Sequence, residues 1–154
     1  MPISTAEVRA IQGGALAGQT LDSPVDGQTR VPISTRFNIP YSYEALFESG
    51  AGINPEEFLA AAHAGCFTVA LTLVLRGMGH PPTDLSTAAR VHEEPQDGGF
   101  AITLIELDCQ GAVPGIDEAE FRRALEAAKA ACPVSKALTN VEIAFADVHL
   151  RATV

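Results

Sequence analysis

The sequence predicts an α+β domain in which strands accompany one long buried helix. Three observations support this: turn signals that divide residues 1–50, a long apolar run from Phe58 to Leu75, and a later succession of strand pair, helix and strand. The chain has 154 residues, enough for one domain with a sizeable core and too few for two ordinary ones. We therefore expect residues 1–154 to form a single domain.

Residues 1–50 have the pattern of short strands separated by turns. Turn signals occur at Gly13-Gly14, at 23–27 and at 38–40. Between the last two, the segment 29–37 partly alternates between apolar and polar residues. Pro32 within it favours an edge strand or a bulge, because proline cannot donate a hydrogen bond to a neighbouring strand.

The apolar run follows a clear helix start. Asn54 is a favourable N-cap, Pro55 suits the first helical position, and Glu57 falls at the third position of a capping box. The helix is predicted to run to Leu75 or Arg76, where glycines follow. Because it is apolar nearly all round, we expect it to be buried on every side. One small domain rarely encloses such a helix, so a partner subunit is implied.

The second half of the chain predicts two strands, a helix and a last strand. The segments Leu85–Glu93 and Phe100–Gln110 are joined by Pro95–Gly99, a hairpin pattern, with an irregularity in the alternation of the second segment. Asp117 is the predicted N-cap of the second helix, which ends near Cys132-Pro133. The apolar face of this helix is expected at Phe121, Ala124, Leu125 and Ala128. The last strand is expected at Val141–Thr153, with Ile143, Phe145 and either Val148 or Leu150 facing inward.

Charge and composition exclude some classes of function. The net charge is −9 and only ten Lys and Arg are present, scattered along the chain, so we expect no nucleic-acid partner. The N-terminal residues show no signal peptide, and we expect a cytoplasmic protein. The run Phe58–Leu75 lies at the lower limit for a membrane span, but Glu56 and Glu57 open it, so a core helix without a membrane partner is favoured.

Three cysteines, Cys66, Cys109 and Cys132, are too few and too widely spaced for a disulfide framework or a zinc ribbon. Taken alone, Cys66 and Cys132 are typical of buried small hydrophobic residues. A metal site formed by them and His63 is a chemically permissible alternative, because positions i and i+3 of a helix converge. Cys109, in a strand, is expected to be structural. No nucleotide-binding loop is present.

Four motifs taken together resemble the OsmC/Ohr family of thiol-dependent organic hydroperoxide reductases, and favour its OsmC-like branch. They are N-P-E-E-F-L-A-A-A-H-A-G-C-F (54–67), G-F-A-I-T (99–103), V-P-G-I-D (113–117) and A-A-C-P-V-S-K-A-L (130–138). The resemblance covers the chain from about residue 54 to its end. It implies a curved antiparallel sheet with a long central helix and a second helix, in an intertwined homodimer with active sites at the subunit interface.

The resemblance also implies a chemistry. Cys66 corresponds to the peroxidatic cysteine, which reduces an organic hydroperoxide to an alcohol and becomes a sulfenic acid. Cys132 corresponds to the resolving cysteine, and an external dithiol or lipoyl-type reductant restores both thiols. No metal or bound cofactor is expected. Glu56 corresponds to the glutamate of an Arg–Glu pair, but roughly 15 Å of helical rise separates it from Cys66, so it must act through arginine or across the dimer.

The arginine is where the sequence departs from the family pattern. Arg36, in S-T-R-F, matches the family segment, but residues 38–47 are inserted before the glycine-containing loop. An alternative alignment places Leu46 at the arginine position. We favour Arg36, with Arg30 as a substitute. If no arginine reaches Cys66, a second hypothesis remains: a non-catalytic OsmC-fold protein that binds an apolar ligand at the dimer interface.

Overall fold

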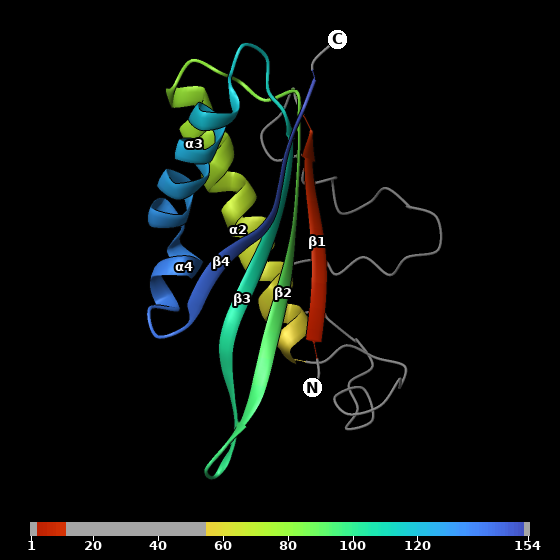
Figure 1. Cartoon of the computed structure of the whole chain (residues 1–154), viewed down its shortest axis with the longest axis vertical. Helices are drawn as coiled ribbons and strands as arrows, with labels where there is room; N and C mark the ends of the chain where they lie inside the picture. Colours follow the sequence, from red (N-terminus) through yellow and green to blue (C-terminus); the bar gives the residue numbers. More distant parts are fainter. Residues whose placement is uncertain (1–2, 12–54, 153–154) are drawn as a thin grey trace, which may run out of the picture.

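The structure is a computed structural model that describes residues 3–11 and 55–152. Within these residues four strands form one sheet in the order β1-β2-β3-β4 (Figure 1). The strands are β1 (Ile3–Ile11), β2 (Asp84–Gln96), β3 (Gly99–Ala112) and β4 (Glu142–Arg151). β1 is the part of the predicted N-terminal strands that the structure describes; the other predictions for residues 12–54 lie outside the described residues.

The sheet is mixed. β1 pairs with β2 and β2 with β3 in antiparallel register, whereas β3 pairs with β4 in parallel register. The α+β class is therefore confirmed, but the expectation of an antiparallel sheet is wrong for the β3–β4 edge. The reason is the connection: the chain leaves β3, passes through two helices and returns in the same direction, as a parallel neighbour requires.

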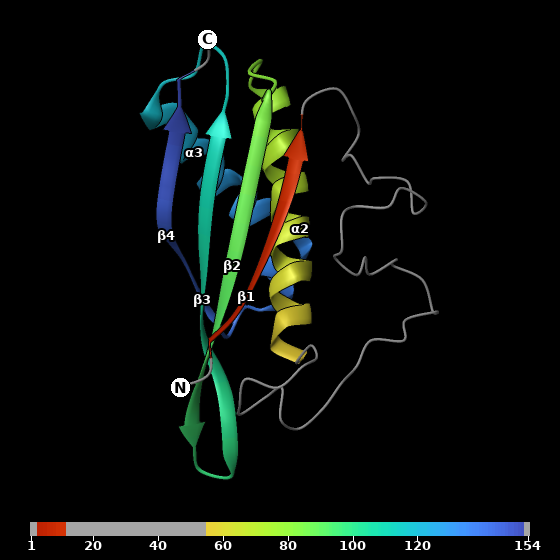
Figure 2. The same ribbon diagram turned by 90° about the vertical axis from the view of Figure 1, so that its right-hand side faces the viewer.

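The three described helices cover one face of the sheet (Figure 2). They are α2 (Pro55–Gly77), α3 (Glu118–Ala131) and α4 (Pro133–Ala137). Side chains of β2 and β3 alternate between the helix-facing side, where Val91 and Leu107 are completely buried, and the opposite side. The core lies between the sheet and the helices, which places every helical functional residue on this one side.

The β2–β3 hairpin confirms two predictions. The strands are joined by a two-residue turn at Asp97-Gly98, where Gly98 has a φ of 95°, a conformation that favours glycine. The predicted irregularity is a β-bulge: His92 pairs with Leu104 and the next residue, Glu93, pairs with Ile102, so Thr103 has no opposite residue. Because of the bulge, Ile102 packs on the same core as Ile105 and Leu107, although it lies three residues before Ile105.

Helix α2 begins at Pro55 and ends at Gly77, close to the predicted bounds. Its inner face packs on the sheet through completely buried side chains such as Phe67 and Leu75. Its outer face is open in the single chain, with Phe58 40% and Leu73 64% exposed, so the chain alone does not bury it on every side. By length and composition α2 is also apolar enough to span a membrane, and 44% of its most apolar stretch is buried in this fold.

Helix α3 confirms its predicted cap and apolar face. The Asp117 side chain accepts a hydrogen bond from the Glu120 backbone N–H at 2.8 Å, and the four predicted apolar residues are all buried. β4 contains a second bulge at Ala146, which lies between Phe145 and Asp147 and is skipped in the pairing with β3. Because of it, Val148 and Leu150 both pack on the core together with Ile143 and Phe145.

Candidate active site

The fold brings Cys66 and Cys132 together although they are far apart in the sequence. Cys66 lies in the middle of α2, and Cys132 lies at the junction of α3 and α4, where α2 packs on both helices. Their thiols lie close enough for each to influence the pKa of the other. Cys66 is half-buried and Cys132 is completely buried. The two cysteines predicted from the sequence therefore lie together, and Cys66 is the less buried of the two.

The backbone holds Cys132 from both sides. Its N–H donates to the Ala128 carbonyl at 2.8 Å as the C-cap of α3, and its carbonyl accepts from the Lys136 N–H at 3.0 Å as the N-cap of α4. Pro133 cannot continue α3 and has the φ that suits a first helical position. The A-C-P-V-S motif thus folds into a rigid corner that fixes the sulfur of Cys132 opposite α2.

The two thiols have opposite electrostatic environments. Burial and the neighbouring Cys132 raise the pKa of the Cys66 thiol, against a lowering by the Val134 backbone. Burial also raises the pKa of the Cys132 thiol. This effect is outweighed by polar groups at the start of α4, first the Ser135 hydroxyl and backbone, and by the Cys66 thiol, so the pKa of Cys132 is lowered overall. In the described part of the chain, the thiolate is therefore favoured on Cys132.

A buried histidine lies behind Cys132. His63, one helical turn before Cys66, is completely buried, and its Nε2 lies 2.8 Å from the Oγ of Ser135 on α4. Burial lowers the pKa of His63, so it is neutral at neutral pH. The sequence allowed His63 as a ligand of a metal site; in the structure it is a core residue with a hydrogen-bond partner. Ser135 was missed as a site residue, although its position three residues after Cys132 in the motif was the available signal.

Glu56 faces a second carboxyl group. It lies in the first turn of α2, half-buried, beside Glu93 at the bulge of β2. Burial, and then the charge and hydrogen bonding of Glu56, raise the pKa of the Glu93 carboxyl. Glu93 was not identified from the sequence, because nothing local connects it with Glu56. Arg36, its substitute Arg30 and the alternative Leu46 lie outside the described residues.

Cys109 lies in the core on β3. Its thiol is buried, and burial raises its pKa to about 12, against a lowering by Thr87. A thiol with such a pKa is almost wholly protonated at neutral pH and is a poor nucleophile. Cys109 is therefore a packing residue, as its position in a strand predicted.

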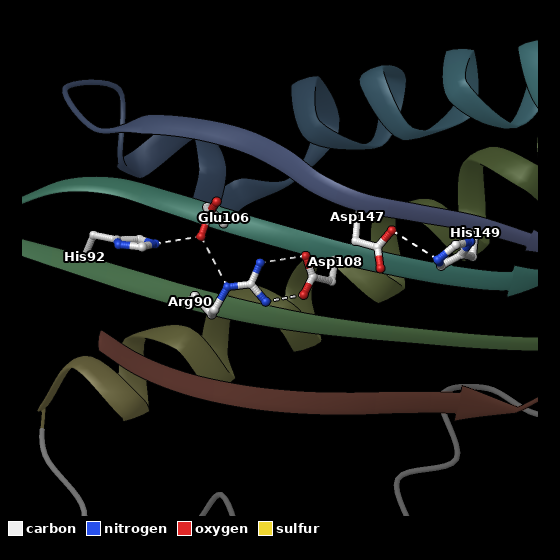
Figure 3. A network of polar contacts seen from close by, with 6 residues as sticks. All are labelled: Arg90, His92, Glu106, Asp108, Asp147 and His149. Carbon is white, nitrogen blue, oxygen red and sulfur yellow. Dashed lines mark hydrogen bonds and ion pairs between the residues drawn. The ribbon is translucent and has the colours of Figure 1, made fainter. Parts of the chain in front are cut away.

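Residues 3–11 and 55–152 contain no cluster of three or more His, Cys, Asp or Glu side chains that can hold a metal. A polar network lies on the face of the sheet away from the helices (Figure 3). There Arg90 forms ion pairs with Glu106 and Asp108, and His92 contacts Glu106 at 2.7 Å. The Arg90 guanidinium and His92 lower the pKa of Glu106, with His92 the larger influence. This network stabilises the pairing of β2 with β3 and is separated from the dithiol by the sheet.

Fold and site define a class of protein: an α+β domain that presents a dithiol at the boundary between a central helix and a capped helical corner. The sequence model of the OsmC-like protein family matches residues 48–146. The chain belongs to this family. The match includes Glu56, Cys66 and Cys132, whereas Arg36 precedes it.

Sequence relatives agree with this family assignment. The chain is 48% identical over 99 residues to peroxiredoxin OsmC of Escherichia coli (strain K12), which covers 64% of this chain and 69% of the relative. It is 37% identical over 96 residues to the organic hydroperoxide resistance protein of Xanthomonas axonopodis pv. citri, covering 61% and 66%.

Solved structures show the same fold. The organic hydroperoxide resistance protein OhrB of Bacillus subtilis superposes with a TM-score of 0.55 at 30% identity, covering 66% of this chain and 73% of that one. An organic hydroperoxide resistance protein from Elizabethkingia anophelis, with thiocyanate bound, gives a TM-score of 0.59 at 26% identity, covering 75% and 79%. A peroxidase-type function in the family is thus supported by the relatives' names, and the OsmC/Ohr resemblance seen in the motifs is confirmed.

Proposed function

We propose that this protein is a thiol-dependent peroxidase that reduces organic hydroperoxides to alcohols through Cys66 and Cys132. The observation that carries the proposal is the proximity of the two thiols, one half-buried and one enclosed. An accessible thiol can meet a peroxide, and an adjacent enclosed thiol can trap the oxidised product before it is oxidised further. The apolar surroundings of Cys66 favour an organic peroxide over hydrogen peroxide.

The reaction has two steps in this chain. The Cys66 thiolate attacks the terminal oxygen of the hydroperoxide; an S–O bond forms, the O–O bond breaks, and the alkoxide takes a proton to leave as an alcohol. The Cys132 thiolate then attacks the sulfur of the Cys66 sulfenic acid, a disulfide forms, and hydroxide leaves as water. An external dithiol or lipoyl-type reductant returns the disulfide to two thiols and is itself oxidised.

The first step needs a cation near Cys66. The influences on the Cys66 pKa within the described residues are burial, Cys132 and the Val134 backbone, and together they raise it. A nucleophilic thiolate requires the opposite, which a neighbouring cation supplies. We assign this role to Arg36, with Arg30 as its substitute, held by Glu56 at the start of α2. Glu93 places a second carboxyl group beside Glu56.

The experiment compares single cysteine variants in a dithiol-dependent assay with cumene or tert-butyl hydroperoxide. Cys66→Ser is expected to lose turnover, and Cys132→Ser to accumulate oxidised Cys66 without a disulfide. Cys109→Ser is the matched control, because Cys109 lies in the core away from the dithiol, and its turnover should equal that of the unchanged protein. Full turnover in Cys66→Ser would overturn the proposal. Wild-type protein that forms no Cys66–Cys132 disulfide with peroxide would favour the non-catalytic binding protein.

We also propose that the protein acts as a homodimer. Phe58, Ala62, Cys66, Val69 and Leu73 share one face of α2, here named the open stripe, and its members are exposed or half-buried in the single chain. A stripe of this kind on a core helix is typical of a subunit interface. Leu73→Glu should therefore yield monomers in size-exclusion chromatography with light scattering, whereas Glu118→Lys, on the exposed side of α3, should not. A monomeric wild-type protein would contradict this.

The remaining assignments belong to the same proposal. We infer that the enzyme needs no metal or bound cofactor, and that it works in the cytoplasm without a nucleic-acid or membrane partner. Elemental analysis of the purified protein, with turnover measured before and after treatment with a chelator, tests the first of these. Loss of activity on chelation, restored by one metal, would contradict it.

A further inference from the structure

The hydrogen bond between His63 and Ser135 joins two buried side chains from different helices. His63 is completely buried in α2, Ser135 is 8% exposed in α4, and Nε2 and Oγ lie 2.8 Å apart. The other ring nitrogen of His63, Nδ1, is buried and has no hydrogen-bond partner among the described residues. A buried polar atom without a hydrogen-bond partner is rare in folded proteins and usually has a structural or chemical reason.

The unpartnered Nδ1 indicates which tautomer is present. Burial keeps His63 neutral, so its ring carries one N–H. A proton on Nδ1 would leave a buried donor without an acceptor, which is the more costly defect. A proton on Nε2 satisfies the donor and leaves only a lone pair unused at Nδ1. The Nε2–H group of His63 therefore donates to the oxygen of Ser135.

This assignment determines where the Ser135 hydroxyl proton points. Since its oxygen accepts from His63, the Ser135 O–H is free to donate to another group. Ser135 lies one helical turn after Cys132, and its hydroxyl lowers the pKa of the Cys132 thiol. A hydroxyl stabilises a thiolate by donating its proton to the sulfur. The result is a chain of donors running from His63 through Ser135 to Cys132, with the Cys66 thiol near the same sulfur.

We propose that His63, acting through Ser135, is a positioning residue that holds the Ser135 hydroxyl proton on the sulfur of Cys132 and so prepares Cys132 to condense with oxidised Cys66. The inference rests on the proposed peroxidase function and assigns its second step. In that step the S–S bond forms as the S–O bond of the sulfenic acid breaks. The departing hydroxide takes up the proton that Cys132 released on ionisation, and leaves as water. In the described part of the chain, Cys66 and His63 are the titratable groups that interact with Cys132 and Ser135, and Glu126, Lys129 and Lys136 line the same hollow as Ser135.

The expected effect on rate is moderate and measurable. Loss of the Ser135 donor reduces the thiolate fraction of Cys132, but a more basic thiolate is also a better nucleophile. With a Brønsted coefficient of about 0.4–0.5, each tenfold loss of thiolate is offset about threefold, so condensation slows by about threefold for each tenfold loss. The lifetime of the Cys66 sulfenic acid at neutral pH should increase by the same factor.

The test follows this lifetime by rapid mixing with tert-butyl hydroperoxide, chemical trapping and mass spectrometry, across a range of pH. Ser135→Ala and His63→Leu should each lengthen it and move the pH midpoint of condensation upward. The double variant should behave as either single variant, because both remove one chain of hydrogen bonds. His63→Gln, which retains an N–H donor, should restore the wild-type profile, whereas a residue that only fills space would give equal results for leucine and glutamine.

Thr68→Val is the matched control. Thr68 is another completely buried polar side chain of α2, and it donates to Thr87 at 2.8 Å, away from the dithiol. Its loss should leave the condensation profile unchanged. Should His63→Leu fail to fold, Ser135→Ala carries the test. Wild-type lifetime and pH midpoint in Ser135→Ala would overturn the inference.

A second measurement separates this inference from the proposed function. In Cys66→Ala protein, thiolate absorbance is titrated against pH with and without Ser135→Ala; Cys109 does not interfere, because burial raises its pKa to about 12. An upward movement of the Cys132 midpoint supports the hydrogen-bond chain without any peroxide chemistry. An unmoved midpoint overturns it. Absence of a Cys66 sulfenic acid in wild-type protein instead overturns the peroxidase function, and with it the condensation role.

Discussion

Replacement of Gly111 by alanine is expected to destabilise the fold by about 1–2 kcal/mol. Gly111 is buried on β3, opposite Leu85 of β2. A methyl group at its Cα would lie 2.9 Å from Cζ of Phe121 and 3.1 Å from Cδ2 of Leu85. Phe121 is 0% and Leu85 2% exposed, so neither side chain can move into solvent. Overpacking of this kind costs about 1–3 kcal/mol, and the reduced freedom of the unfolded chain returns about 0.4–1 kcal/mol.

The assay is urea unfolding followed by circular dichroism, at one protein concentration because the stability of a dimer depends on it. With a slope of about 1–3 kcal/mol/M, the midpoint of the alanine variant should fall by roughly 1 M at an unchanged slope. Gly77→Ala is the control: it lies at the end of α2, and a methyl group there meets nothing within 4 Å. Its stability should be unchanged or slightly higher. An unchanged midpoint for Gly111→Ala would refute the packing of Phe121 against the sheet.

Two further predictions concern a cap and a buried ring. Asp117→Ala removes the hydrogen bond from the Glu120 N–H and should lower the free energy of unfolding by about 1 kcal/mol in the same assay. Glu118→Ala is the control: Glu118 is an exposed i,i+4 partner of Arg122, and its loss should change stability by less than about 0.5 kcal/mol. The pKa of His63 is lowered from its ordinary value of 6.5 by burial, so its contribution to stability is complete above that value and is lost as the pH falls through the folded pKa. His63→Leu should therefore lose less stability than wild type between pH 7 and pH 5 (about the range where histidine titrates), and an equal loss in both proteins would contradict the burial of a neutral ring.

The sequence was sufficient wherever a feature is determined locally. Pro55 marks the first turn of α2, the Asp117 side chain caps α3, and the broken alternation near Thr103 is a bulge. Each depends on residues within a turn or two of one another. The parallel pairing of β3 with β4 depends instead on how the chain returns after two helices, and no local pattern in either strand specifies a neighbour's direction.

The candidate site divides in the same way. The A-C-P-V-S corner is local, and Cys66 and Cys132 were paired by family resemblance, not by spacing. The contacts of His63 with Ser135 and of Glu56 with Glu93 each join a residue of α2 to an element far along the chain. They arise from the packing of α2 on α4 and β2, so single-sequence reasoning identified one member of each pair and missed the other.

The position of Cys66 on α2 connects the chemistry with the assembly. A helical residue and the residue three positions later differ by about 60° around the helix axis, so a helix whose inner face holds His63 must carry Cys66 near the edge of that face. There the thiol meets Cys132 on one side and belongs to the open stripe on the other. In the proposed mechanism, a peroxide therefore reaches Cys66 from the side of the stripe, whereas Cys132 approaches from the side of α3 and α4. The same mechanism makes the surface that covers the stripe a wall of the substrate pocket. Substitutions at Leu73 that alter assembly should then change the Michaelis constant for bulky hydroperoxides more than the lifetime of the Cys66 sulfenic acid.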